Sequence, residues 1–457
     1  MLNPHQPPSD GSLLNQLQQR VLVADGAMGT ALQGQDLSID QDYLGRENCV
    51  DVLVRSRPDL VEAVHMSFLE VGCDLVSTDS FGANVLTLNE FDQELASWCV
   101  DLNKEAAAIA RAAADRYSTK DKPRFVLGSM GPGTKLITLG QVTWKQMLDS
   151  YQQQAEGLIA GGVDAFLIET CQDLLQTKCA INACIAALEK ASKTPSEVPI
   201  FVSVTIETTG TMLLGTEISA AITALRSYPI AALGLNCATG PTEMRDHLSV
   251  LNKRWDRNLL VMPNAGLPVL VDGQTHFPLS PEPYAKTMMR FVDEYGINLI
   301  GGCCGTTPEH LGALIDGLGE HSAPVRRCED QRPGCTSLYQ HVDYKQELSI
   351  LMVAERTNAN GSRKFKRLLD EENWDGLVSM AREEVAGGGQ ALDVCVDFVG
   401  RDGVVDMQEV ASRFAKQIQA PLMLDSTDAA VLRAGLERCG GKCIVNSINL
   451  EDGEQRF

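Results

Sequence analysis

The strongest constraint on the fold is a regular alternation of short apolar runs with segments of helical periodicity. Eight runs rich in β-branched residues, each ending in a polar or glycine-rich turn, cover 21–25, 74–78, 124–129, 164–170, 200–205, 231–237, 259–266 and 298–304. Between them, apolar side chains recur at helical spacing, as in 94–118 with Leu95, Trp98, Leu102, Ala106, Ile109 and Ala113. Eight strand–helix units predict a closed (βα)8 or TIM barrel. No glycine-rich nucleotide fingerprint follows the first run, which argues against an open doubly wound sheet.

The alternation stops and then resumes, which divides the chain into parts. Residues 1–12 are polar and contain prolines, so we expect a disordered lead-in to a barrel spanning 13–322. Residues 323–347 have two prolines, mixed charge and no apolar periodicity, which predicts a linker. Further strands are predicted at 348–355, 391–397, 421–426 and 442–447, within a second domain at 348–457. Four units make half a barrel with an open edge. The sequence therefore predicts an α/β chain with one TIM barrel and a second, incomplete (βα)8-type barrel that is cut off.

The charge of the chain excludes some kinds of partner. Its 457 residues include 39 Lys and Arg against 60 Asp and Glu, a net charge of −21. A nonspecific nucleic-acid binder needs a basic surface, so nucleic acid is not an expected partner. No apolar run approaches the ~18 residues that span a bilayer, and the first residues lack the basic and apolar regions of a signal peptide. We therefore expect a cytoplasmic protein with no membrane partner.

Fourteen cysteines in such a chain indicate reduced thiols, metal ligands or small core residues. Cys99, Cys179 and Cys184 fall on amphipathic helices, and we expect them to pack in the core. Three others stand at predicted strand ends: Cys237, Cys303 and Cys304. Three thiolates can bind zinc at ~2.3 Å and leave the fourth tetrahedral position open. Two alternatives remain: His310 could close the site as a fourth ligand, or the cysteines are small residues of a glycine-rich turn.

The other strand ends carry polar groups that suit an amino acid. Asp25 begins the small-residue segment DGAMGT (25–30), where backbone N–H groups can approach a carboxylate, and Asp25 and Glu169 could receive an ammonium group. A tight turn and a structural salt bridge are the alternatives for these two features. Three thiolates make zinc a poor Lewis acid for carbonyls but still allow it to deprotonate a substrate thiol. The rim therefore suits a sulfur nucleophile that attacks an alkyl donor.

Three motifs carry a family resemblance. GGCCGTTPEH (301–310), GLNCATGP (234–241) and DGAMGT resemble the zinc-dependent homocysteine S-methyltransferases over roughly residues 13–320. The resemblance implies that Cys237, Cys303 and Cys304 bind zinc. It also implies homocysteine contacts on the same rim from Asp25, Gly26, Ala27, Met28, Glu169, Asn236 and Asn264. TDSFGAN (78–84) resembles the loop after the second strand in this family.

The second part resembles another domain. AERTNANGSRKFKRLL (354–369), LDVCVD (392–397), LDST (424–427) and VNSIN (445–449) are similar to the pterin-binding domain of cobalamin-dependent methionine synthases. This implies that Asp425 and Asn446 bind the pterin of 5-methyltetrahydrofolate, with Asp393 and Asn358 lining the same mouth. Cys395 departs from the asparagine expected at its position. The basic residues Arg363, Lys364, Lys366 and Arg367 either form a solvated face or meet the acidic tail of folate.

Together the resemblances imply a reaction. Zinc-bound homocysteine thiolate would take a methyl group from methylcobalamin to form methionine, and 5-methyltetrahydrofolate would remethylate cob(I)alamin. Nothing in the chain resembles a corrinoid-binding histidine motif, so cobalamin-binding and reactivation modules are expected outside it. One alternative is a betaine- or S-methylmethionine-dependent homocysteine S-methyltransferase, against which the second part argues. A noncatalytic zinc-binding scaffold is an alternative of another class.

Overall fold

The computed structural model describes residues 12–457 except 272–273, 320, 327, 448–452 and 454–457. Residues 1–11 of the predicted lead-in lie outside this part, as do residues 448 and 449 of the last folate-like motif. Among the helices that the structure describes, none combines the length and apolar character needed to span a membrane.

The first part of the chain is a parallel barrel. Its strands are β1 (Leu22–Val23), β2 (Leu75–Ser77), β3 (Phe125–Met130), β4 (Ala165–Cys171), β5 (Ile200–Val204), β6 (Ile230–Asn236), β7 (Asn258–Met262) and β10 (Leu299–Ile300). They form one sheet in the order β1-β10-β7-β6-β5-β4-β3-β2, with every neighbouring pair parallel. The backbone N–H of Asp74 donates to the carbonyl of Val23 at 2.7 Å, and a bridge from Ala24 to Leu75 closes the ring. Each of the eight predicted runs overlaps one of these strands, so the predicted fold class is confirmed.

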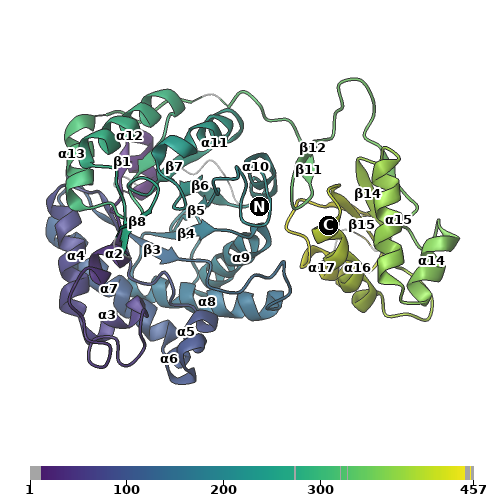
Figure 1. The fold of residues 1–457 in the computed structure, drawn as a ribbon, viewed down its shortest axis with the longest axis horizontal. Coiled ribbons are helices and arrows are strands. Elements are labelled where there is room, and N and C mark those ends of the chain that lie inside the picture. The colour runs from purple at the N-terminus through teal and green to yellow at the C-terminus, as the bar shows by residue number, and fades with distance from the viewer. Residues whose placement is uncertain (1–11, 272–273, 320, 327, 448–452, 454–457) are drawn as a thin grey trace.

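Helices surround the strands, as Figure 1 shows. They are α2 (Met28–Gln33), η1 (Val50–Val52), α3 (Leu53–Ser56), α4 (Pro58–Glu70), α5 (Val85–Phe91), α6 (Gln93–Ser97), α7 (Cys99–Tyr117), α8 (Trp144–Gly161), α9 (Leu174–Lys190), α10 (Ile218–Leu225), α11 (Pro241–Arg254), α12 (Pro281–Tyr295) and α13 (Pro308–Leu318). The single helix predicted over 94–118 is divided at Trp98 into α6 and α7. Cys99, Cys179 and Cys184 are buried, as expected for core residues.

The barrel has a packed interior that is closed at one end. Leu22, Leu127 and Leu260 are among the fully buried side chains that fill it. Leu13 and Leu17 of α1 (Leu13–Gln19) belong to the same apolar cluster. Because α1 leads directly into β1, it covers the N-terminal ends of the strands. The opposite face, where the strands end, is therefore the face available for a site.

Asp74 fixes the seam between the first two strands. Its carboxylate accepts two hydrogen bonds of 2.9 Å from Arg20 and one of 3.0 Å from the backbone N–H of Val23. Arg124 approaches the same carboxylate at 3.3 Å and is itself buried. A charged residue at the start of the second predicted run is thus structural.

The second part is a four-stranded parallel sheet. Its strands, in the order in which they pair, are β13 (Val353–Ala354), β14 (Ala391–Val394), β15 (Leu422–Asp425) and β16 (Ile444–Asn446). The helices of this part are α14 (Arg363–Asp370), α15 (Trp374–Ala386), α16 (Gly403–Gln417) and α17 (Ala429–Leu436). The strand predicted at 348–355 is wrong over its first five residues. Leu348 and Ile350 there are 100% and 79% exposed, because the chain pairs with β14 only from Val353.

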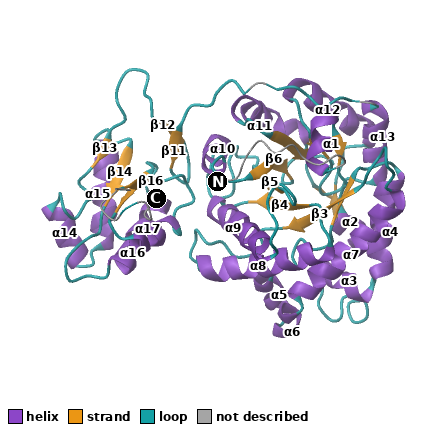
Figure 2. Cartoon of the chain, turned by 180° about the vertical axis from the view of Figure 1, so that it is seen from behind, coloured by secondary structure: helices purple, strands orange, loops and turns teal. Residues whose placement is uncertain are grey.

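Two short hairpins were not predicted. One, β8 (Val269–Val271) with β9 (Gln274–His276), lies in the loop after β7. The other, β11 (Gly334–Thr336) with β12 (His341–Asp343), lies within 323–347, where we expected a linker. Figures 1 and 2 both show this second hairpin between the barrel and the smaller sheet.

The β11–β12 hairpin contacts both parts of the chain. The backbone N–H of Thr336 donates to Lys442 at 3.0 Å, and that of Glu217 donates to Tyr339 at 2.9 Å. The buried Lys178 of α9 adds a direct link, since its Nζ donates to the carbonyls of Cys439 at 2.9 Å and Gly441 at 3.1 Å. The two parts are therefore joined by specific bonds.

Candidate metal and substrate site

Three cysteine sulfurs meet at the C-terminal face of the barrel. Cys237 follows β6, and Cys303 and Cys304 follow β10, so one turn from each side of β7 supplies the thiols. All three Sγ atoms lie within 4.8 Å of one another, and those of Cys237 and Cys304 are 3.9 Å apart. Tetrahedral zinc with Zn–S bonds of ~2.3 Å places its sulfurs ~3.8 Å apart. The donor set and its spacing therefore fit zinc.

The three thiols share protons unequally. Hydrogen bonds from Cys303 and Cys304 lower the pKa of Cys237 to about 3. The same hydrogen bonds to Cys237 raise the pKa of Cys303 well above its usual value and that of Cys304 to about 12. Cys237 is therefore the sulfur that ionises most readily. A cation that binds all three sulfurs must displace their remaining protons, and its own charge drives that displacement.

His310 does not complete the cluster. Its Nδ1 lies 3.2 Å from the backbone N–H of Thr307 and 3.0 Å from the Thr307 hydroxyl, where it caps α13. Its Nε2 lies 2.8 Å from the carbonyl of Leu279. Both ring nitrogens are therefore engaged, and the only group of potential ligands that close within the described residues is the set of three cysteines. The fourth position of a tetrahedral ion remains for a ligand from outside this set.

Asp25 is a buried carboxylate held by the neighbouring strand. The backbone N–H and the hydroxyl of Ser77 donate to it at 2.7 and 2.9 Å. Burial raises the pKa of Asp25 to about 7, although both bonds from Ser77 oppose the shift and the charge of Glu169 adds to it. An ammonium group beside the two carboxylates would restore their ionised forms.

The segment after Asp25 is tightly packed against the cysteine turn. A Cβ on Gly26 would lie 2.6 Å from the hydroxyl and 2.9 Å from the carbonyl of Thr306, so only glycine fits there. The N–H of Ala27 donates to Thr306 at 3.3 Å, and that of Met28 donates to Gly26 at 3.1 Å. A substrate carboxylate bound by these N–H groups, as the sequence implied, would compete with those two bonds.

Glu169, at the mouth of the barrel, accepts hydrogen bonds from two neutral side chains. The Ser129 hydroxyl donates to its Oε1 at 2.6 Å and Asn236 Nδ2 to its Oε2 at 3.3 Å. Burial raises the pKa of Glu169 to about 7 against the Ser129 hydrogen bond, and the charge of Cys237 adds to the shift. No basic side chain among the described residues pairs with this carboxylate, so the alternative of a structural salt bridge is not what holds it.

The two asparagines of the rim are engaged by the protein. Asn264 Oδ1 accepts the backbone N–H of Cys304 at 3.1 Å, which fixes the cysteine turn. Asn236 is completely buried and bonds to Glu169 and Thr170. Sequence reasoning assigned no role to Ser77, Ser129 or Thr170. Ser77 precedes the expected strand end by one residue, and only the register of the closed barrel turns it toward Asp25.

The candidate folate residues converge at the ends of three strands. Asn358 Nδ2 donates to Asp393 at 2.7 Å and to Asp425 at 3.0 Å. Asn446 pairs with Asp425 across β15 and β16. Asp393 Oδ1 is buried and has no hydrogen-bond partner within the described residues. Burial raises the pKa of Asp393 and of Asp425 against the Asn358 hydrogen bond. Cys395, the departure from the expected motif, instead accepts a contact from Asn360 Nδ2 at 3.5 Å.

The basic residues of α14 are divided among several partners. Lys364 pairs with Glu383 at 3.4 Å, and Lys366 Nζ lies 4.4 Å from the centre of the Phe398 ring. Arg367 lies 3.9 Å from Glu371 one turn along the helix. These exposed contacts are typical of a solvated face.

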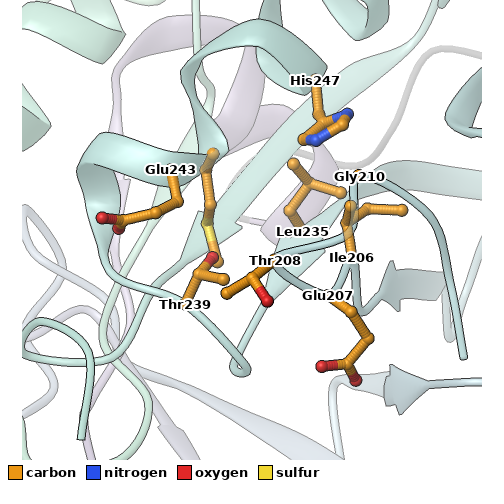
Figure 3. Close-up of a pocket in the computed structure, with 9 residues that line it drawn as sticks. Ile206, Glu207, Thr208, Gly210, Leu235, Thr239, Glu243 and His247 are labelled. Atoms are coloured by element: carbon orange, nitrogen blue, oxygen red, sulfur yellow. The ribbon is translucent and has the colours of Figure 1, made fainter.

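A separate pocket lies outside the strand wall, between the loop after β5 and α11. Its wall includes Leu235, Thr239 and His247, and none of the three clustered cysteines. Figure 3 shows the carboxylates of Glu207 and Glu243 on opposite sides of it, directed away from Leu235. Its polar groups do not converge, so the cysteine-bearing mouth is the better candidate site.

Comparison with known proteins agrees with this geometry. The family model described as homocysteine S-methyltransferase matches residues 22–318, and that of pterin binding enzymes matches 354–457. The chain belongs to the homocysteine S-methyltransferase family. It is 46% identical to the methionine synthase of Mycobacterium tuberculosis over 98% of its length and 46% identical to that of Mycobacterium leprae over all of it. It spans 37% and 38% of the lengths of these two relatives.

Solved structures agree with the barrel fold. The homocysteine methyltransferase MmuM from Escherichia coli, in its metallated form, aligns with a TM-score of 0.51 at 22% identity. The alignment covers 66% of this chain and 97% of that one. The oxidized form gives a TM-score of 0.51 at 23% identity, covering 67% and 98%.

Proposed function

We propose that this chain is the homocysteine-binding and folate-binding part of a cobalamin-dependent methionine synthase, 5-methyltetrahydrofolate–homocysteine S-methyltransferase. Residues 13–322 would bind zinc and homocysteine, 323–347 would join the parts, and 348–457 would belong to the folate-binding domain. The observation that carries the proposal is the cluster of three sulfurs beside two carboxylates whose hydrogen bonds come only from neutral groups.

The roles of the residues follow from their contacts. Cys237, Cys303 and Cys304 would hold zinc, which when bound would favour the thiolate form of homocysteine. Asp25 and Glu169 would bind the substrate's ammonium, because Ser77 and Ser129 orient these carboxylates without neutralising them. The segment from Gly26 to Met28, which leads into α2, would face the substrate carboxylate. The methyl donor would be methylcobalamin, carried by modules outside this chain, and 5-methyltetrahydrofolate would recharge it.

Metal analysis of single-cysteine variants tests the proposal. We expect the unsubstituted chain to retain one zinc against a chelator and to form methionine from homocysteine and free methylcobalamin. Cys304→Ala should lose both properties, because two sulfurs cannot hold the ion against competition. Cys328→Ala is the matched control, since this half-buried cysteine donates only to Lys253 away from the cluster. A Cys304→Ala chain that forms methionine at full rate without zinc would overturn the mechanism.

The coordination of zinc separates an enzyme from a scaffold. Zinc-edge X-ray absorption should show a new Zn–S contact when homocysteine is added. No change in the sulfur count would favour a noncatalytic zinc site.

Folate binding distinguishes a cobalamin-dependent methionine synthase from a betaine- or S-methylmethionine-dependent homocysteine S-methyltransferase. We propose that Asp393 Oδ1, buried without a partner, is a group that the pterin satisfies, with Asp425, Asn446 and Asn358 beside it. Titration with 5-methyltetrahydrofolate should saturate, and Asp425→Asn should weaken binding by about tenfold or more, the cost of one charged hydrogen bond. Asp375→Asn, at an exposed position of α15, is the control. Absence of saturable binding would favour a betaine- or S-methylmethionine-dependent enzyme.

A further inference from the structure

The side-chain amide of Asn236 forms all of its hydrogen bonds with other groups of the protein. It is completely buried at the end of β6, directly before Cys237. Its Oδ1 accepts the backbone N–H of Thr170 at 2.8 Å. Its Nδ2 donates to the Thr170 hydroxyl at 2.9 Å and to Glu169 at 3.3 Å, and it also lies 3.9 Å from the Sγ of Cys303. Both amide protons are therefore committed, and no donor remains for a substrate.

The backbone on both sides of these bonds is in a rare conformation. Thr170 has φ of +56°, and Cys237 and Ala238 have φ of +58° and +53°. The left-handed region is unfavourable for residues with a side chain, and most of all for a β-branched one such as Thr170. Such turns persist only where the surroundings hold them. Strands β4 and β6 are not neighbours, because β5 lies between them, so Asn236 connects two strained strand ends across a third strand.

The two strand ends carry the two halves of the site. Glu169 directly precedes Thr170, and Cys237 directly follows Asn236. Glu169 is fixed by Ser129 on one oxygen and Asn236 on the other. The carbonyl of Asn236 is itself fixed by the Thr205 hydroxyl of the β5 loop at 3.1 Å. A displacement of this asparagine would therefore move the carboxylate and the sulfur together.

We propose that Asn236 is a positioning residue that couples the metal ligand Cys237 to the substrate-binding carboxylate Glu169, and that it does not contact homocysteine. Its Oδ1 holds the left-handed turn at Thr170, and its Nδ2 holds the Glu169 carboxylate. This inference rests on the proposed function for the identity of the two ligands, zinc and homocysteine. It replaces the expectation that Asn236 binds the substrate.

Two substitutions separate the two tasks of the amide. Asn236→Asp keeps an oxygen for the Thr170 N–H but removes both donors. Asn236→Ala removes the acceptor as well. Ser129→Ala removes the other hydrogen bond to Glu169 and leaves the hydrogen bonds between Asn236 and Thr170 in place. Asn298→Ala is the matched control, because Asn298 is a buried asparagine before β10, at the opposite end of the barrel, whose Oδ1 accepts the backbone N–H of Leu259 at 3.0 Å.

Zinc affinity, by competition with a chelator, and homocysteine affinity, by calorimetry on the zinc-loaded chain, give independent readouts. We expect Asn236→Ala to lose about tenfold or more in both affinities, as is typical when a group that orients a metal ligand is removed. Asn236→Asp should lose homocysteine affinity to at least the extent of Ser129→Ala. It should keep most of its zinc affinity, because the contact with the Cys303 sulfur that it also loses is long, at 3.9 Å. That rescue by the isosteric variant would not follow from a general loss of packing.

Several results would overturn the inference. If Asn236→Ala left the zinc and homocysteine affinities unchanged, Asn236 would not be a positioning residue. The same conclusion would follow if the zinc affinity of Asn236→Asp were as low as that of Asn236→Ala. Asn236→Asp with homocysteine affinity equal to the unsubstituted chain would refute the hold on Glu169. Failure of the proposed function has a different signature, because the unsubstituted chain would then not bind homocysteine. The zinc affinities of the variants would still test whether Asn236 positions Cys237.

Discussion

Each of the two buried carboxylates at the barrel mouth is oriented by a serine from a neighbouring strand of the sheet. Ser77 of β2 serves Asp25, and Ser129 of β3 serves Glu169 one strand further on. A hydroxyl donor fixes the oxygen positions but adds no positive charge. Each carboxylate can therefore still attract a cation, which a salt bridge to lysine or arginine would prevent.

Gly26 offers a test of how closely the mouth is packed. Gly26→Ala should push the DGAMGT segment away from Thr306, because its Cβ would lie 2.6 Å from that hydroxyl. We expect the KM for homocysteine to rise about tenfold or more through misplacement of the ligand groups, with zinc retained. In the same segment, Gly29→Ala meets nothing within 4 Å and should behave as the unsubstituted chain. Equal KM values for the two variants would contradict this packing argument.

A buried acid pair behind the second strand predicts a pH effect on stability. Burial raises the pKa of Asp51 to about 6, and burial together with the charge of Asp51 raises that of Asp79 well above its usual value. Asp79 Oδ2 has no hydrogen-bond partner in the described structure. Because the folded chain holds these protons more tightly than the unfolded chain, their contribution to stability is complete below about pH 4. It declines as the pH rises through about 6.

Asp79→Asn should therefore stabilise the chain at high pH. We expect the free energy of unfolding to rise at pH 8, where burial and the charge of Asp51 disfavour the Asp79 carboxylate, and to change little at pH 4, where Asp79 is protonated. Urea unfolding at the two pH values measures the difference. The exposed Asp121→Asn should show no such dependence. An equal effect of Asp79→Asn at both pH values would argue against the raised pKa.

Sequence reasoning identified the candidate site residues with distinctive chemistry but missed the residues that hold them in place by hydrogen bonds. Asp25, Glu169 and the three cysteines end predicted strands, so their convergence follows from the barrel alone. Asn236 ends a strand too, but the strained turn at Thr170 that consumes its amide is a tertiary feature. No local pattern marks which partner a buried amide will choose.

At the level of elements, strand periodicity predicted the barrel well because each strand is a buried run between polar turns. The strand lengths were less predictable, since β1 and β10 each have two residues where runs of five and seven were predicted. The β11–β12 hairpin was missed because its three-residue strands have no periodicity of their own. Contacts with Lys442 and Glu217, distant in sequence, hold it in place.

The contacts of Asp74 between β1 and β2 predict how strongly this residue stabilises the barrel. Asp74→Ala would leave the buried Arg124 without its carboxylate and would remove a bond to Val23. We expect a loss of ~3–5 kcal/mol in the free energy of unfolding, the usual cost of an uncompensated buried charge. The control Asp59→Ala breaks an exposed ion pair with Arg57 and should cost under ~1 kcal/mol. Similar costs for both variants would show that the seam does not depend on Asp74.

On the scale of the whole chain, the junction between barrel and smaller sheet depends on a few polar contacts. Lys178 is buried and its two hydrogen bonds reach the loop between α17 and β16. Its position on a barrel helix was readable from the sequence. Its partners, more than 260 residues away, were not.

Lys178→Met should loosen the junction without unfolding the barrel. Two buried carbonyls would lose their charged donor, at a cost of ~1–3 kcal/mol. We expect faster proteolysis of 348–457 and an earlier melting step of that part, with zinc retained. Lys190→Met, on the same helix, breaks only an exposed pair with Glu156 and serves as control. A single unchanged melting transition for Lys178→Met would contradict this role.

The pairing of the first strand with the last has a consequence for how the protein is made. On one side β1 pairs with β10, and Cys303 and Cys304 lie three and four residues after the end of β10. A nascent chain that has not yet released about 300 residues from the ribosome lacks both the closing strand and two of the three sulfurs. A metal ion that needs all three sulfurs would therefore bind after ring closure during synthesis, because a ribosome-bound intermediate would offer it only the single thiol of Cys237 at this site.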